Sequence, residues 1–389
     1  MRIARILTRL NLGGPARQAL ASDPLLAARG HVVQVFTGAP AVGEGDLFDT
    51  FREKGIQVER VPGLARGLSV AGDLRALHAL KKRLVEFAPD VVHTHASKAG
   101  AIGRRAARAV PKARRVHTFH GHVLEGYFGD TVSRAITAFE RRWARETQRI
   151  VAVSHATADD LLRLKVVDDA TKLVVIQPGI DLADLLAIER RDGALRREIG
   201  AADGDFVVGV VGRLAEVKRP EWALDAFELL AVRYPRLHLV FIGDGDQRGL
   251  VERRITGFAP ELQRRAHLLG MREDMRPVLA DVDLVLSTSR AEGMPVALIE
   301  AAAAGKPVVA TNVGGVAEIV VHERTGWLAK DVDELAYGLA QYLDAPATLF
   351  PALAIRARMR VEKNHSGAAL ADRLESLYKS VVEEPTCAS

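Results

Sequence analysis

The chain has 389 residues, of which 48% are hydrophobic and 26% charged, and it carries a net charge of +5 at pH 7. This length exceeds what one hydrophobic core normally serves, and the composition excludes a disordered chain, so we expect two globular domains. The single cysteine, Cys387, excludes a disulfide framework and a cysteine-ligated metal cluster, whereas the mild positive charge suggests an anionic partner such as a phosphate group.

The N-terminal stretch MRIARILTRLNLGG has an apolar run that is interrupted by Arg5, Thr8 and Arg9, so it lacks the apolar core of a signal peptide. None of the apolar stretches along the chain reaches the ~18–20 residues that cross a bilayer. We therefore expect a cytoplasmic protein that is soluble or lies peripherally on the inner face of the membrane.

The first half of the chain alternates short β-branched runs with segments in which apolar residues recur at helical spacing. The predicted strands are 2–8, 31–37, 56–61, 90–95, 114–120, 149–154 and 173–178. Several are almost continuously hydrophobic, as expected of strands covered by helices on both faces. After the first strand, Gly13 and Gly14 fit either a close approach of the backbone to a ligand or an ordinary tight turn.

The second half repeats the scheme, with predicted strands at 205–212, 237–245, 266–270, 283–289 and 306–311. This alternation predicts two doubly wound α/β domains, 1–181 and 182–365, followed by an amphipathic helix in 366–389. The sequence does not show on which domain that helix packs. Because ligands bind at the carboxyl ends of strands in such sheets, we expect the site in a cleft between two facing domains.

Histidines gather near the ends of two predicted strands of the first half, and they are His93, His95, His117, His120 and His122. Alternation along a strand places His93 and His95 on the same face. Such a cluster raises the question of zinc, but it lacks a carboxylate or cysteine at a ligand spacing. We therefore expect polar contacts with a substrate rather than a metal site.

A basic segment, 98–115, lies between these strands in a stretch without acidic residues. Its basic residues are Lys98, Arg104, Arg105, Arg108, Lys112, Arg114 and Arg115. A solvated helix face is the default interpretation, and an anionic membrane surface or a site for an acceptor phosphate are the alternatives. We do not expect a nucleic-acid partner, because aromatic residues that could stack on bases make up only 5% of the chain.

The predicted strand 205–212 ends at Gly212 and is followed by Arg213, Lys218 and Arg219. A strand-end glycine beside a guanidinium and an ammonium suits a diphosphate, although a loop with solvated charges is equally compatible with these residues. Pro220 then begins the next helix. The glycine fingerprint of dinucleotide sites, GxGxxG, and the phosphate loop GxxxxGK[ST] are both missing.

The stretch AEGMPVALIEAAAAG contains two carboxylates, Glu292 and Glu300, on either side of a predicted helix start. We expect Pro295 at the first helical position, Glu292 in the preceding loop and Glu300 inside the helix, which ends before Gly305. The free amides of the first turn suit an anion, and Glu300 could bind both hydroxyls of a ribose. A loop residue and a helix-surface glutamate are the ordinary alternatives.

Taken together, these motifs resemble the family 4 retaining glycosyltransferases of the GT-B fold, over essentially the whole chain. The resemblance rests on GGPARQ, HTFHG, IQPGID, GRLAEVK, GMR after AHLL, AEGMPVALIEA, GGVAEIV and TGWL, in this order. It implies a hexosyltransferase that uses a nucleotide sugar, UDP-linked by family frequency, and needs no metal or other cofactor. The implied acceptor is a hydroxyl of a lipid-linked sugar, a polysaccharide or a secondary metabolite.

The resemblance also implies roles for individual residues. The catalytic set would be His120, Arg213, Lys218 and Glu292, with Arg213 and Lys218 at the diphosphate and the other two at the transferred sugar. The first domain would bind the acceptor and the second the nucleotide sugar. The further donor-binding positions would be Gly13, Gly14, Gly212, Met271, Arg272, Gly293, Met294, Pro295, Val296 and Glu300.

Three other functions remain open at this point. A GT-B sugar-nucleotide epimerase would convert the donor without an acceptor. A nicotinamide oxidoreductase is disfavoured by the missing glycine fingerprint. A non-catalytic nucleotide- or membrane-binding module would bind the donor but release no nucleoside diphosphate.

Overall fold

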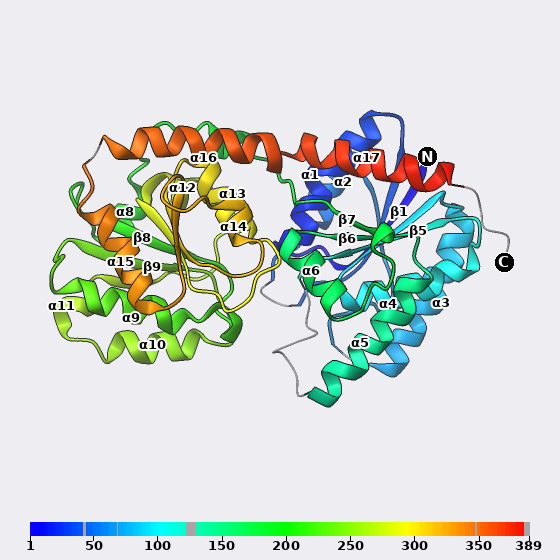
Figure 1. The fold of residues 1–389 in the computed structure, drawn as a ribbon, viewed down its shortest axis with the longest axis horizontal. Coiled ribbons are helices and arrows are strands. Elements are labelled where there is room, and N and C mark those ends of the chain that lie inside the picture. Colours follow the sequence, from blue (N-terminus) through cyan, green and yellow to red (C-terminus); the bar gives the residue numbers. More distant parts are fainter. Residues whose placement is uncertain (42–43, 68, 122–129, 347, 385–389) are drawn as a thin grey trace. The chain divides into compact units, whose positions relative to one another are not determined.

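The computed structural model describes residues 1–41, 44–67, 69–121, 130–346 and 348–384. The chain forms two compact units (Figure 1). The first comprises Met1–Asp181 together with the chain from Asn364 onward, and the second comprises Leu182–Lys363. The C-terminal helix therefore belongs to the first unit, a point that the sequence left open.

In the described part of the first unit, parallel strands form a seven-stranded sheet in the order β3-β2-β1-β4-β5-β6-β7. β1 lies inside the sheet and pairs with β2 on one side and with β4 on the other. The strands are β1 (Arg2–Arg9), β2 (Val32–Gly38), β3 (Gln57–Arg60), β4 (Val91–His95), β5 (Arg114–Phe119), β6 (Arg149–Ala152) and β7 (Leu173–Val175).

Helices cover both faces of this sheet, as the nearly continuous hydrophobic strands require. They are α1 (Gly14–Ala28), α2 (Phe48–Glu53), α3 (Val70–Phe87), α4 (Ser97–Ala106), α5 (Asp130–Arg145), α6 (His155–Arg163) and α17 (Gly367–Glu383). The last of these packs along α1 (Figure 1). It contributes Leu370, Leu374 and Tyr378 to a buried cluster that also contains Ile3 of β1 and Val91 of β4.

The second unit contains a six-stranded parallel sheet in its described residues, in the order β10-β9-β8-β11-β12-β13. The strands are β8 (Phe206–Val211), β9 (Leu237–Ile242), β10 (Ala266–Leu268), β11 (Leu284–Ser287), β12 (Val308–Thr311) and β13 (Gly326–Ala329). The helices are α7 (Ala183–Leu186), α8 (Ala194–Ile199), α9 (Pro220–Ala231), α10 (Arg248–Thr256), α11 (Pro260–Gln263), α12 (Arg276–Asp281), α13 (Val296–Ala303), α14 (Val316–Ile319), α15 (Val332–Leu343) and α16 (Leu349–His365).

The prediction of two doubly wound α/β sheets is confirmed, and each predicted strand corresponds to an observed one. The edge strand β13 was missed, because its sequence GWLA lacks a β-branched run and contains a glycine. Among the described residues, none of the helices combines the length and the apolar character needed to span a bilayer.

Candidate functional site

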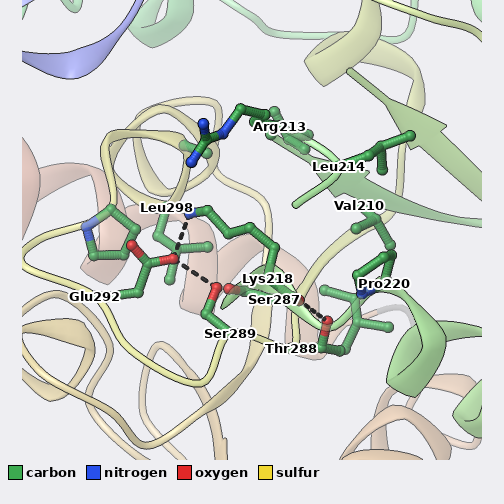
Figure 2. Close-up of a pocket in the computed structure, with 15 residues that line it drawn as sticks. Val210, Arg213, Leu214, Lys218, Pro220, Ser287, Thr288, Ser289, Glu292 and Leu298 are labelled. Carbon is green, nitrogen blue, oxygen red and sulfur yellow. Dashed lines mark hydrogen bonds and ion pairs between the residues drawn. The ribbon is translucent and has the colours of Figure 1, made fainter. Parts of the chain in front are cut away.

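The second sheet reverses its strand order between β8 and β11, which lie side by side at the centre of the sheet. Ligands of doubly wound sheets bind at the carboxyl ends of the strands at such a reversal. A pocket opens at this place. It is lined by Val210, Val211, Gly212, Arg213, Leu214, Lys218, Pro220, Leu286, Ser287, Thr288, Ser289, Glu292, Pro295, Ala297 and Leu298 (Figure 2).

Lys218 is held in this pocket by contacts from the end of β11. Its ammonium nitrogen lies 2.5 Å from Oε1 of Glu292, and the Ser289 hydroxyl donates to the same oxygen at 2.6 Å (Figure 2). The Thr288 hydroxyl lies 2.8 Å from the carbonyl oxygens of both Lys218 and Arg219. The loop that carries the lysine is therefore fixed to β11 before any ligand binds.

Arg213 follows the strand-end Gly212 and is exposed. Figure 2 shows its guanidinium on the side of the pocket where Lys218 meets Glu292. In contrast to Lys218, Arg213 makes no ion pair within the described ranges of the chain. The pocket thus offers one tethered cation and one accessible cation, an arrangement that suits a ligand with two adjacent negative charges.

Gly212, Gly243 and Gly270 follow the ends of the neighbouring strands β8, β9 and β10. The amide of Gly212 donates to Ile242 O at 2.9 Å, and the amide of Gly243 donates to Gly270 O at 2.8 Å. Gly243 has a φ of 144°, and a Cβ there would lie 1.9 Å from the carbonyl oxygen of Gly212. These backbones therefore pack closely, and only the end of β9 separates the turn after Gly270 from the end of β8.

That turn carries two of the predicted donor-binding residues, Met271 and Arg272. Met271 is exposed, and Arg272 forms an ion pair with Glu198 of α8. Neither residue is among those that line the pocket. A contact between this turn and the base of a nucleotide stays a prediction.

The helix α13 begins one residue later than predicted. Pro295 is its N-cap, with an extended backbone (φ −76°, ψ 112°), so the expectation of Pro295 as the first helical residue is wrong. The helix ends as predicted, before Gly305, which adopts a left-handed φ of 73°. Glu300 lies buried inside α13 and does not line the pocket.

The loop before α13 packs against Gly314 and Gly315. In the sequence these two glycines were noted only as part of the motif GGVAEIV. Gly314 has a φ of 51°, and a Cβ there would lie 1.7 Å from the carbonyl oxygen of Glu292. The amide of Gly315 donates to Gly293 O at 3.0 Å. These contacts fix the backbone of the loop that positions Glu292. The adjacent predicted residues Gly293, Met294 and Val296 do not line the pocket.

The first sheet reverses its strand order between β1 and β4. Gly13 is the N-cap of α1 and Gly14 its first residue, as predicted for the turn after the first strand. The prediction that His93 and His95 share a face of β4 is confirmed, since their ring centroids are 4.2 Å apart. His120, one residue beyond β5, places Nε2 2.9 Å from Nδ1 of His95.

The two remaining histidines of the cluster are His117 and His122. His117 bonds Thr94 through Nδ1 at 2.8 Å and packs against Gly100 of α4, whereas His122 lies outside the described residues. Within the described ranges, no group of three or more His, Cys, Asp or Glu residues is arranged to hold a metal ion. Burial lowers the pKa of His93, His95 and His117 well below the usual value, and it lowers that of His120 to about 3.

Sequence reasoning missed three residues that surround these histidines. Arg5 in β1 forms a buried ion pair of 2.6 Å with Asp23 of α1, and the Tyr378 hydroxyl of α17 lies 2.6 Å from Nδ1 of His93. The one available signal was a charged residue inside a predicted buried strand, at position 5.

The basic segment 98–115 is only partly a solvated face. Its buried member is Arg104, which pairs with Glu140 of α5 at 2.5 Å. Arg108 and Arg115 both pair with Glu146. Arg105 and Lys112 are exposed.

Both units match models of known protein families. Residues 12–184 match the model described as Glycosyltransferase Family 4, and residues 205–345 match the model described as Glycosyl transferases group 1. The chain is 28% identical over 342 residues to the UDP-Gal:alpha-D-GlcNAc-diphosphoundecaprenol alpha-1,3-galactosyltransferase of Escherichia coli, covering 87% of each chain. It is 29% identical over 391 residues to the D-inositol 3-phosphate glycosyltransferase of Mycobacterium avium (strain 104), covering 93% of this chain and 87% of the relative.

The structure is also similar to solved structures. That of Anabaena Alr3699/HepE in complex with UDP-glucose aligns with a TM-score of 0.80 at 23% identity, over 98% of this chain and 100% of that one. At this identity the likeness describes the fold.

Proposed function

Because the chain belongs to the family 4 glycosyltransferases and has their GT-B fold, we propose that it transfers a hexose from a nucleotide sugar to a hydroxyl acceptor with retention of the anomeric configuration. The observation that carries this proposal is the pocket between β8 and β11, where Arg213 and Lys218 lie beside the strand-end Gly212. In this proposal the second unit binds the donor and the first unit binds the acceptor.

The proposed chemistry places positive charge where negative charge develops. Cleavage of the bond between the anomeric carbon and the phosphate oxygen leaves a nucleoside diphosphate, which Arg213, Lys218 and the free amides at the start of α13 would stabilise. These groups would supply the neutralisation without a metal ion. Glu300 would bind the ribose, and the turn at Met271–Arg272 would meet the base.

Retention needs either a protein nucleophile or attack from the face of the leaving group. The carboxylate of Glu292 is paired with Lys218 and accepts a hydrogen bond from Ser289, which lowers its nucleophilicity. We therefore propose that the acceptor hydroxyl attacks on the leaving-group face, with the departing phosphate taking its proton. Glu292 and His120 would contact the transferred sugar. The alternative of a GT-B epimerase is not favoured, since both relatives described above are named as transferases.

The donor is the first point to test, and UDP-sugars are the expected class, as in the name of the Escherichia coli relative. In a thermal-unfolding screen of UDP-, GDP- and ADP-sugars, a UDP-sugar at 100 times its Kd should stabilise the protein by ~2.7 kcal/mol. The other two classes should stabilise it less at equal concentration. Stabilisation by a GDP- or ADP-sugar alone would contradict UDP as the nucleotide. Donor turnover in the absence of any acceptor would favour the epimerase instead.

For the acceptor we propose a lipid-linked sugar, the class named for the Escherichia coli relative, reached by peripheral contact of segment 98–115 with an anionic membrane. The exposed Arg105 and Lys112 would make this contact. At ~1 kcal/mol for each basic residue, R105Q/K112Q should weaken binding to vesicles with anionic lipid by roughly 30-fold in a flotation assay. R108Q is the matched control, because Arg108 already pairs with Glu146. Equal flotation of wild type and R105Q/K112Q would exclude this surface.

A further inference from the structure

A line of hydrogen bonds in the first unit leads from α1 to His120. Asp23 pairs with Nη2 of Arg5 at 2.6 Å, and Nη1 of Arg5 lies 3.1 Å from Nε2 of His95. On its other side, Nδ1 of His95 lies 2.9 Å from Nε2 of His120. The side chains of Arg5 and Asp23 are almost completely buried, so water does not compete for these contacts.

Only one assignment of donors and acceptors is compatible with both hydrogen bonds of His95, those to Arg5 and to His120. A guanidinium has five N–H donors and no acceptor, so Nε2 of His95 must accept from Arg5. A neutral imidazole with an accepting Nε2 carries its proton on Nδ1, and His95 therefore donates to Nε2 of His120. By the same rule, His120 must carry its own proton on Nδ1.

The opposite direction is disfavoured by the position of Arg5. It would place an N–H of His95 against an N–H of a buried guanidinium, leaving two donors without an acceptor. Protonation of either histidine to the cation is opposed by burial and by the charge of Arg5, which lower the pKa of His95 well below the usual range and that of His120 to about 3.

Neighbouring contacts keep Arg5 in this position. The carboxylate of Asp23 accepts the shortest hydrogen bond from Arg5, and Nη2 of Arg5 also lies 3.4 Å from the hydroxyl of Tyr378 in α17. Tyr378 in turn bonds His93, whose Nε2 lies 2.7 Å from the Thr118 hydroxyl. This second branch shares Arg5 but does not include His95 or His120.

We propose that Arg5 and His95 are positioning residues that set the tautomer of His120, so that its neutral ring presents an Nδ1–H donor to an oxygen of the bound sugar. The tautomer follows from the contacts within the first unit alone. The identification of the acceptor oxygen as that of a sugar rests on the proposed function.

The tautomer can be read directly, without substrate, from long-range ¹⁵N–¹H spectra of the full chain labelled with ¹⁵N-histidine. H120Q identifies the His120 signals by their loss. We expect the Nδ1–H pattern for His120 in the wild type, and an Nε2–H pattern would overturn the proposal. H95F, which removes both hydrogen bonds of His95 but keeps a ring, should move His120 toward the Nε2–H form that free imidazole side chains prefer.

Two further variants separate positioning from general packing. H95N keeps an amide donor near the place of Nδ1 and should restore the Nδ1–H pattern of His120. T118V removes a hydrogen bond from the second branch and should leave that pattern unchanged; a shift as large as that of H95F would overturn the proposal.

Kinetics then test the link to the proposed function. Loss of a correctly directed hydrogen bond in H95F should lower kcat/KM for transfer by about 10- to 100-fold, with unchanged affinity for UDP, which lacks the sugar. If the tautomer is as inferred but H95F transfers sugar at the wild-type rate, the contact with the sugar is wrong and the positioning of His120 stands. If the tautomer differs, the positioning is wrong whatever the rate.

Discussion

Lys218→Ala is expected to lower kcat for sugar transfer by ~10²- to 10³-fold, which corresponds to ~2.7–4 kcal/mol of lost transition-state stabilisation. The reason is that Lys218 is held in place by Glu292 and Ser289, so its charge is aligned with the leaving phosphate before the reaction starts. Arg213→Ala should have an effect of the same order. Initial rates with saturating donor and acceptor would measure both.

The fold should survive these substitutions. The Lys218–Glu292 pair is partly exposed, and such pairs contribute little to stability. K330A is the matched control, because Lys330 pairs with Glu334 on an exposed helix turn far from the pocket in the sequence. Wild-type turnover in both K218A and R213A would contradict the assignment of the pocket as a diphosphate site.

The first unit is expected to lose about 5 kcal/mol of stability when the pH falls from 7.5 to 5.5. Burial lowers the pKa of His93, His95 and His117 well below 6.5 in the folded state and that of His120 to about 3, so these side chains stay neutral there and bind protons only on unfolding. The unfolded chain then binds more protons below pH 6.5, and stability falls as the pH falls. Four such groups remove about 5.5 kcal/mol over this range.

Asp23 acts in the opposite direction. Burial raises its pKa to about 6 against the pull of Arg5, so the folded state gains a proton that the unfolded state lacks near pH 5.5, which offsets about 1 kcal/mol. Urea unfolding followed by the fluorescence of Trp143, in a W222F/W327F background, reports on this unit alone. H117Q should reduce this loss by about 1.4 kcal/mol, roughly 30% of the total. A constant free energy of unfolding between pH 7.5 and 5.5 would contradict the neutral buried histidines.

The strands and the switch-point pocket follow from local sequence because both depend on short-range patterns. Hydrophobic runs such as 205–212 define a buried parallel strand, and the residues just after it define the edge where ligands bind. For this reason Gly212, Arg213, Lys218, Glu292 and Pro295, five of the predicted donor-binding residues, line one pocket. β13 escaped prediction because its four residues carry no such pattern.

Contacts between distant positions could not be predicted. The pairing of Lys218 with Glu292 spans 74 residues, and the contact between Arg5 and Tyr378 spans 373. A single sequence contains no record of such proximity. It shows only that an arginine stands in a buried strand, and the burial of that charge implies a partner without naming it.

The place of α17 in the first unit has a consequence for synthesis on the ribosome. Its residues Leu370, Leu374 and Tyr378 complete a core that begins at Ile3, so the first unit lacks part of that core until the last segment has emerged. At ~5–20 residues per second, the interval between residue 181 and residue 383 is roughly 10–40 s. During this interval the second unit is made in full while an apolar face of the first remains uncovered. The unit that is translated first therefore completes its core last. We expect the apolar face exposed in the meantime to be a binding surface for chaperones.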